Sequence, residues 1–203
     1  MPDFFRQFID RKIIATEKYS YQWVDACVDA MNLPFGLETI DVAIRPNVLH
    51  HFAHPIKFLL DLHGYLKPSG YILLLEPNPS FLLLLALRVM RHEGWSFEVD
   101  VFDPMALAND PADPWSGNNA VSELMFGDRK VFEKHAPGFE IVHDNFSECL
   151  MFVLSGGVTA KTRTFELPMK VLKIVDAIDR KLCRLSPKIF AMARSVVLRK
   201  RIA

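Results

Sequence analysis

The chain has 203 residues, of which 50% are hydrophobic and 24% are charged, and its 24 Lys and Arg residues balance 24 Asp and Glu residues. This length and composition suit one globular domain with a sizeable core and exclude a disordered, fibrous or repeat protein. A net charge of zero gives no support for a nucleic-acid-binding protein, which usually carries a basic excess.

The cysteines and the apolar segments indicate the setting of the protein. Cys27, Cys149 and Cys183 are odd in number and far apart, so they form neither a disulfide framework nor a CxxC metal site. The first residues are too charged for a secretory signal, and Glu76 and Pro77 interrupt the most apolar stretch. Neither half of that stretch reaches the roughly 20 residues of a membrane-spanning helix. We therefore expect a soluble, cytoplasmic protein.

Short apolar runs predict the strands of the first half, at residues 13–16, 23–28, 40–44 and 71–75. Apolar residues at helical spacing predict helices at residues 4–9 and 56–66. Continuous apolar strands on either side of a helix are typical of a parallel sheet that helices cover on both faces. The predicted fold class is α/β.

The second half is less regular. Residues 79–131 are rich in aromatic residues, Asp and Pro and show little periodicity, which is more typical of a lid or a binding segment than of a simple connection. Apolar runs at 139–142 and 149–154 predict a closing antiparallel hairpin. The apolar spacing of residues 167–202 predicts C-terminal helices that end in a basic run.

Four segments of the first half carry a recognisable set of motifs: VDAMNLPF at 28–35, IDVAI at 40–44, NVLHHF at 47–52 and LKPSGYILLLEP at 66–77. In order and spacing they closely resemble the class I S-adenosylmethionine-dependent methyltransferases of the type 11, ubiquinone-biosynthesis-like group. The resemblance implies a Rossmann-like fold and S-adenosyl-L-methionine as cofactor. It divides one domain of residues 1–203 into a cofactor-binding half (1–78), a lid or acceptor insertion (79–131), closing strands (132–157) and C-terminal helices (158–203).

The resemblance also implies roles for residues at the ends of the predicted strands. Glu17 would accept the ribose hydroxyls of the cofactor, although a solvated loop acid is the plainer interpretation. Asp29 would accept a hydrogen bond from the adenine amino group. Alternatively, it would hold its loop as an Asx turn, and the two roles are compatible. Further contacts to the cofactor would come from Ala30, Met31, Asn47 and His50.

Two motif residues are candidates for catalysis, although methyl transfer from a sulfonium needs little beyond placement. His51 is the leading candidate for a general base, against a role in capping or packing. Two adjacent histidines point in different directions on a helix, and no Cys or carboxylate lies at ligand spacing, so no metal site is expected. Glu76 could face the acceptor pocket, or it could be a turn acid before Pro77.

Residues 113–157 are similar to a bacterial subgroup of these methyltransferases that often occurs with glycan and cell-surface biosynthesis. The candidates for the acceptor pocket are Trp115, Asn118, Asn119 and Phe126, since amides suit hydroxyl-rich ligands and Trp suits a sugar face. A polar loop packed by its aromatic residues explains them equally well. The expected reaction is methylation, at oxygen, of a small-molecule or saccharide-linked acceptor. The basic tail 194–201 could touch an anionic membrane, or it could be a solvated helix end.

One family motif is missing. A strand and a glycine-rich loop should precede residues 4–9, yet the first glycine is Gly36. In the family, the missing first strand lies in the middle of the sheet, between the strands that correspond to those predicted here at 13–16 and 40–44. We expect an N-terminally truncated chain with weak cofactor binding, against a divergent protein or a fragment that another chain completes. The alternative function is a non-catalytic relic or a partner subunit of an active enzyme. A third possibility, a nucleotide-sugar or dinucleotide oxidoreductase, would need the same missing loop and a Tyr-x-x-x-Lys pair, which the sequence also lacks.

Overall fold

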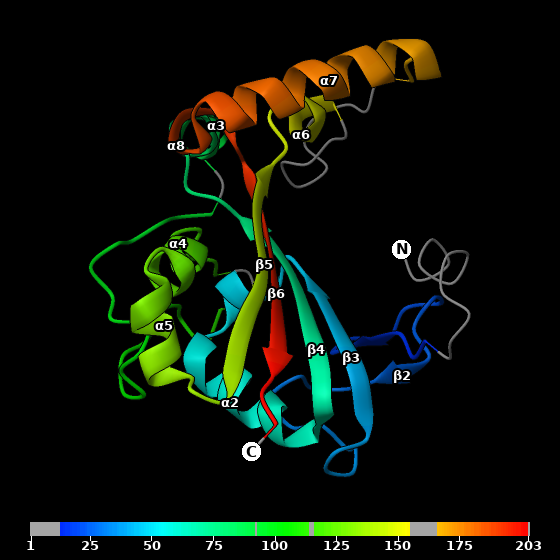
Figure 1. Ribbon diagram of the computed structural model, residues 1–203, viewed down its shortest axis with the longest axis vertical. Helices are drawn as coiled ribbons and strands as arrows, with labels where there is room; N and C mark the ends of the chain where they lie inside the picture. Colours follow the sequence, from blue (N-terminus) through cyan, green and yellow to red (C-terminus); the bar gives the residue numbers. More distant parts are fainter. Residues whose placement is uncertain (1–12, 92, 114–115, 155–165, 203) are drawn as a thin grey trace.

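The computed structural model describes residues 13–91, 93–113, 116–154 and 166–202, whose strands form two sheets (Figure 1). A small parallel sheet contains β1 (Thr16–Glu17) and β2 (Ala26–Cys27). The larger sheet has the order β3-β4-β6-β5 and contains β3 (Ile40–Pro46), β4 (Leu66–Pro77), β5 (Phe139–Ser147) and β6 (Ala193–Lys200). Strands β3 and β4 are parallel, and β6 is antiparallel to both β4 and β5.

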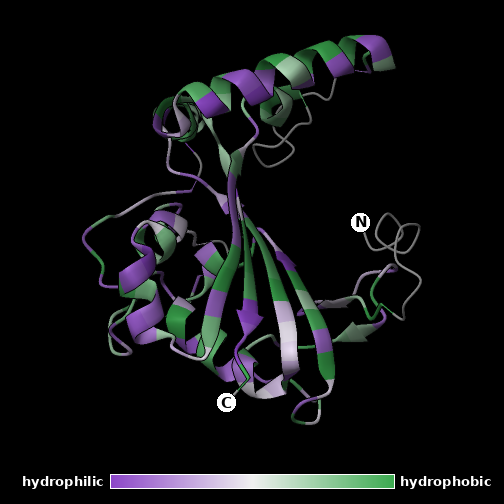
Figure 2. Cartoon of the chain, in the orientation of Figure 1, coloured by the Kyte–Doolittle hydropathy of each residue, from purple (hydrophilic) through white to green (hydrophobic). Residues whose placement is uncertain are grey.

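The helices form two groups. One group lies beside the larger sheet and consists of the 3-10 helix η1 (Leu49–His51), α2 (Pro55–Tyr65), α4 (Val121–Phe126) and α5 (Arg129–His135). The other consists of α3 (Phe81–Met90), α6 (Leu150–Leu154), α7 (Met169–Leu185) and α8 (Pro187–Phe190). Helix α7 crosses one end of the molecule, and Figure 2 shows polar and apolar bands alternating along it. Among the described helices, none combines the length and the apolar character that crossing a membrane requires.

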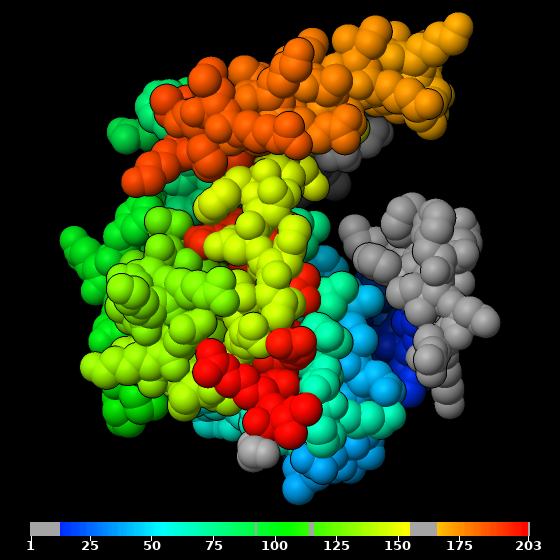
Figure 3. Space-filling view, viewed as in Figure 1, coloured from blue at the N-terminus to red at the C-terminus, as the bar shows by residue number. Residues whose placement is uncertain are grey.

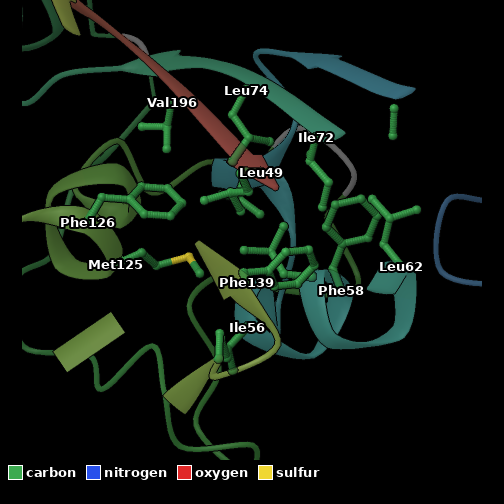
Figure 4. Close-up of a cluster of buried hydrophobic side chains, with 14 of the residues drawn as sticks. Leu49, Ile56, Phe58, Leu62, Ile72, Leu74, Met125, Phe126, Phe139 and Val196 are labelled. Atoms are coloured by element: carbon green, nitrogen blue, oxygen red, sulfur yellow. The ribbon is translucent and has the colours of Figure 1, made fainter. Parts of the chain in front are cut away.

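The main core lies between the larger sheet and the first group of helices. Inward residues of β4 and β6, such as Ile72 and Val196, meet Phe58 of α2 and Phe126 of α4 (Figure 4). The largest side chains are almost fully buried here, with Phe58 at 1% and Phe126 at 2% exposure. Burial of a large aromatic side chain contributes about 1.5–3 kcal/mol, so this layer holds β3 and β4 in place beneath η1.

The opposite face of the larger sheet is less buried than the sequence predicts. Leu73, Leu75 and Val197 point to this face and are partly exposed, while Val42 is 46% and Val142 is 42% exposed. Within the described ranges no helix crosses this face, and strand atoms form the surface there (Figure 3). The prediction of a sheet covered on both faces is therefore wrong for the described part of the chain. Part of this sheet is antiparallel, since β6 pairs antiparallel with β4 and β5, and antiparallel sheets commonly leave one face to solvent.

The closing strands are antiparallel as predicted, but their partners differ. Strand β5 pairs with β6, residues 150–154 form α6, and the predicted C-terminal helices end at Phe190. In β6 the side chains of Val196 and Leu198 are buried at strand spacing between two neighbouring strands. A strand paired on both edges satisfies all its backbone groups, which outweighs the helical spacing of the sequence.

The basic tail is consequently not a helix end. It is strand β6, in which Arg194 is 3% and Lys200 is 9% exposed. Arg194 pairs with Asp144 and Glu123, and the ammonium of Lys200 donates to the carbonyl of Leu66 at 2.8 Å. The charged groups of Arg194 and Lys200 therefore form ion pairs and hydrogen bonds inside the fold.

The other predicted elements can be compared with the structure directly. The strands expected at 40–44 and 71–75 are β3 and part of β4, whereas those expected at 13–16 and 23–28 shrink to the two-residue strands β1 and β2, and β1 shares only Thr16 with its prediction. The helix expected from Pro55 is α2, and the helix expected at 4–9 lies outside the described residues. No strand among the described residues joins β1 to β3, so the two sheets remain separate there. The α/β fold with antiparallel C-terminal strands is confirmed.

Candidate active site

The carboxylate of Glu76 organises the turn that follows β3. Oε1 accepts the backbone N–H groups of Val48 at 3.0 Å and of Leu49 at 2.9 Å, and Oε2 accepts that of His50 at 3.3 Å. Oε2 also lies 2.6 Å from Nδ1 of His50. Asn47 makes the turn possible with a φ of 52°, a conformation that asparagine tolerates better than most residues. Glu76, at the end of β4, thus fixes the start of η1 at the carboxyl end of β3.

Burial and charge act in opposite directions on His50, which is 3% exposed. Burial lowers its pKa, but hydrogen bonds and Coulomb attraction from Glu76 and Glu93 raise the pKa to about 9 overall. When no other cation is bound, the ring is therefore a buried imidazolium between two carboxylates.

His51 and Glu93 complete a group that we call the histidine–glutamate cluster, which consists of His50, His51, Glu76 and Glu93. Nδ1 of His51 lies 2.9 Å from the carbonyl oxygen of Ser116, and because that oxygen can only accept, Nδ1 carries the proton. Nε2 of His51 lies 3.9 Å from Oε1 of Glu93, and Nε2 of His50 lies 3.5 Å from Oε2. The two histidine rings are 4.2 Å apart between centroids.

The cluster adjoins an open pocket of about 500 Å³, which is lined by residues 94–96, 107–111 and 116–118. Ser116 links the pocket wall to His51, and Gly117 lies against the carboxylate of Glu93 so closely that a Cβ would stand 3.0 Å from it. The side-chain amide of Asn109 donates to the carbonyls of His50 at 2.6 Å and Phe52 at 3.1 Å. The pocket wall is therefore anchored directly to η1.

The residues predicted for the acceptor pocket lie in different places in the structure. Asn118 lines the pocket, but its Oδ1 accepts the N–H groups of Ser96 and Ala120. Asn119 is buried, and its amide donates to Glu93 at 3.3 Å and to the Gly94 carbonyl. Both amides therefore hold the loop, which is the plainer of the two interpretations.

Phe126 does not line the pocket, contrary to the prediction. It lies in the main core, where it packs against Phe132 and beneath the guanidinium of Arg194. An aromatic residue at the end of a short amphipathic helix faces the core because burial stabilises it more than exposure in an open pocket. Trp115 lies outside the described residues.

The acids predicted to bind the cofactor lie on the small sheet. Glu17 ends β1, and Oε1 accepts the N–H of Lys18, while Oδ1 of Asp29 accepts the N–H of Met31 as an Asx turn. Glu17 also acts on Arg45 of β3: burial lowers the pKa of Arg45 and the charge of Glu17 raises it.

Partly exposed carboxylates at neighbouring strand ends can accept hydrogen bonds from ribose hydroxyls and an adenine amino group, so this pair of acceptors fits an adenosine ligand. Ala30 and Met31 line a second pocket of about 200 Å³ together with Leu62 and Tyr65. Asn47 and His50 lie on the other sheet, at the carboxyl end of β3.

Glu93 and Asn109 are the residues that the sequence did not reveal. Both lie in the irregular segment, 43 and 59 residues from His50, and no motif or periodicity marks them. Polar residues are frequent throughout that segment, so their type alone does not distinguish these two.

Comparison with known proteins agrees with the fold. Residues 8–74 match the sequence model of a methyltransferase domain family. The structure of a Bacillus halodurans C-125 protein, assigned as a methyltransferase, has a TM-score of 0.51 at 15% identity and covers 99% of this chain and 86% of its own.

Curated relatives match over short segments. The phthiotriol/phenolphthiotriol dimycocerosates methyltransferase 1 of Mycobacterium ulcerans (strain Agy99) is 38% identical over 52 residues, which is 26% of this chain and 19% of the relative. The reducing polyketide synthase ppsB of Aspergillus oryzae (strain ATCC 42149 / RIB 40) is 29% identical over 79 residues, 39% of this chain and 3% of that protein. The chain thus matches only a small part of these relatives. The domain match covers about a third of the chain, and the fold agrees with it: the chain has the Rossmann-like fold of S-adenosylmethionine-dependent methyltransferases.

Proposed function

We propose that this protein transfers a methyl group from S-adenosylmethionine to a hydroxyl oxygen of a small-molecule or saccharide-linked acceptor. The observation that carries the proposal is the place of the histidine–glutamate cluster, which lies at the carboxyl ends of β3 and β4 and adjoins the pocket of residues 94–96, 107–111 and 116–118. In open α/β sheets this edge is where ligands bind.

The small sheet would hold the adenosine part of the cofactor. Glu17 and Asp29 present carboxylates there, and Asn47 and His50, which were also predicted to contact the cofactor, stand at the end of β3. Bound S-adenosylmethionine supplies an electrophilic methyl group. The protein's task is then to place an acceptor oxygen in line with that group and to take up its proton.

His51 is the residue best placed to interact with the acceptor proton. Its side chain is 29% exposed, and because Nδ1 donates to Ser116, the lone pair is on Nε2. Glu76 was predicted as a second catalytic candidate, but it is 1% exposed and occupied by η1 and His50. We assign Glu76 as a positioning residue for the two histidines.

Two features support a hydroxyl-bearing acceptor. The pocket lining includes the polar residues Ser96, Asn109, Asp110 and Ser116, which suit an oxygen-rich ligand. In addition, the Mycobacterium ulcerans relative is named for a triol acceptor. We further propose that the protein acts in the cytoplasm, because its three cysteines are free thiols.

The proposal can be tested on the full chain in two steps. Calorimetric titration with S-adenosylhomocysteine should show saturable binding that Glu17→Gln weakens about tenfold, since one charged hydrogen bond is lost. Glu98→Gln, at an exposed residue, serves as the matched control. Transfer of radiolabelled methyl groups to a panel of phenols, glycosides and lipid alcohols then identifies the acceptor. Absence of both binding and transfer contradicts the proposal.

A second candidate function is that of a non-catalytic partner subunit, which is favoured by the two sheets that no described strand connects. It predicts no methyl transfer by this chain alone and a rise in the activity of a partner methyltransferase when the chain is added. Transfer by the purified chain contradicts it.

A further inference from the structure

The histidine–glutamate cluster has the composition and geometry of a metal site. We propose that Nε2 of His50, Nε2 of His51 and the carboxylate of Glu93 bind one divalent transition-metal ion, with Zn²⁺ as the representative. The ligand atoms of these three residues all lie within 4.8 Å of one another. Atoms that share one ion at about 2.1 Å are about 3–4 Å apart, so only small movements are required.

The hydrogen bonds of the two histidines orient them as ligands. Nδ1 of His50 faces the carboxylate of Glu76, and Nδ1 of His51 faces the carbonyl of Ser116, which directs both Nε2 atoms toward Glu93. Metal-ligating histidines almost always donate their other nitrogen to a carboxylate or a backbone carbonyl.

The charges in the cluster also favour a cation. Two carboxylates are held in a mostly buried group, with the Glu76 side chain at 2% and the Glu93 side chain at 15% exposure. With neutral histidines they would carry two negative charges, which a divalent ion balances. The ion would replace the proton on Nε2 of His50. Imidazole ligands select transition metals over Mg²⁺ and Ca²⁺.

Glu93 is held in place by its surroundings. The amide of Asn119 donates to Oε2 at 3.3 Å, and Gly117 leaves the space that the carboxylate occupies. The sequence predicted no metal site because it has no carboxylate near His50 and His51 at ligand spacing. The fold brings Glu93 to them from the irregular segment.

Three protein ligands leave a coordination position for an external oxygen, as in catalytic zinc sites. The pocket touches the cluster through Ser116 and Gly117, so water or an acceptor hydroxyl would reach the position from that side. This consequence rests on the proposed function: the ion would then polarise the acceptor oxygen, and His51 would act as a ligand instead of a base. Metal binding itself does not depend on methyl transfer.

The test uses the full chain, freed of metal with a chelator and then titrated with CoCl₂ or ZnCl₂. We expect one equivalent of Co²⁺ to give visible d–d absorption that Zn²⁺ abolishes by competition. His51→Gln and Glu93→Gln should each weaken binding at least about tenfold. His135→Gln is the matched control, because His135 is an exposed histidine whose Nδ1 also lies 2.9 Å from a carbonyl oxygen.

The outcomes separate the two proposals. No saturable 1:1 binding, unchanged affinity in both cluster variants of native melting temperature, or equal loss in the control overturns the metal site. If one cluster variant does not fold, the other decides. Metal binding without methyl transfer supports the site and contradicts the proposed function. Methyl transfer by metal-free protein that binds no Co²⁺ supports the proposed function and contradicts the metal site.

Discussion

Nδ1 of His50 and Oε2 of Glu76 lie 2.6 Å apart, and both side chains are almost completely buried. The same carboxylate also accepts three backbone N–H groups of the turn that carries His50. This one pair therefore connects the end of β4 to the turn after β3 and determines where the histidines of the cluster stand.

Glu76→Gln should destabilise the protein by about 3 kcal/mol. The amide NH₂ would face donors that now share two carboxylate oxygens, and buried unsatisfied groups cost about 1–3 kcal/mol each. Urea unfolding of both proteins measures the difference. Glu140→Gln is the matched control, because its partner Arg199 is 43% exposed and solvent screens this surface pair, so its loss should have a much smaller effect. Equal effects in the two variants would show that Glu76 does not organise the turn.

Arg194→Lys should also be strongly destabilising, by about 2–4 kcal/mol. The guanidinium is buried and holds both oxygens of Asp144, at 2.8 and 2.7 Å, as well as the carbonyl of Phe126 at 2.8 Å. A lysine cannot reproduce this planar set of donors. Thermal unfolding checks the prediction, with Arg199→Lys as the exposed comparison on the same strand. A loss below about 1 kcal/mol would contradict it.

Phe126→Leu should lower stability by about 1–2 kcal/mol and leave acceptor KM unchanged. The ring is 2% exposed in the core, away from the pocket lining, so the variant removes packing only. Phe97→Leu, at a side chain 49% exposed, should change stability little. A change in KM for the acceptor without loss of stability would place Phe126 in the pocket after all.

The three thiols should differ in reactivity. Cys27 is exposed, whereas Cys149 and Cys183 are buried, and burial together with Asp179 raises the pKa of Cys183 to about 11. At pH 8 a disulfide reagent should label Cys27 in native protein and the other two only after unfolding. Rapid labelling of Cys183 in native protein would contradict its burial.

The same thiol predicts how stability changes with pH. An unfolded cysteine ionises near pH 8.5, and the folded form holds its proton up to about pH 11. The folded state therefore binds more protons between these values, and the contribution of Cys183 to stability falls as pH rises through this window. Denaturant unfolding of the native protein and of Cys183→Ala should show a steeper loss between pH 8.5 and 11 in the native protein.

The sequence by itself was sufficient for the long strands of the first half and for the family motifs. Short apolar runs ended by turn residues, such as residues 40–44 before Pro46, depend on neighbours along the chain, so local chemistry determines them. The positions of Glu17, Asp29 and His50 at strand ends followed from the same patterns. The order of the strands is less local, and residues 193–200 became a central strand although their spacing also suits a helix.

Only the tertiary structure decided how the site is assembled. It turned Glu76 from a candidate acid into a buried support, moved Phe126 into the core and brought Glu93 to the two histidines. These outcomes depend on contacts between residues 26 to 68 positions apart, whose packing and electrostatics have no signature in a local pattern. Local sequence specifies elements, whereas the free energy of burying and pairing side chains specifies which of them meet.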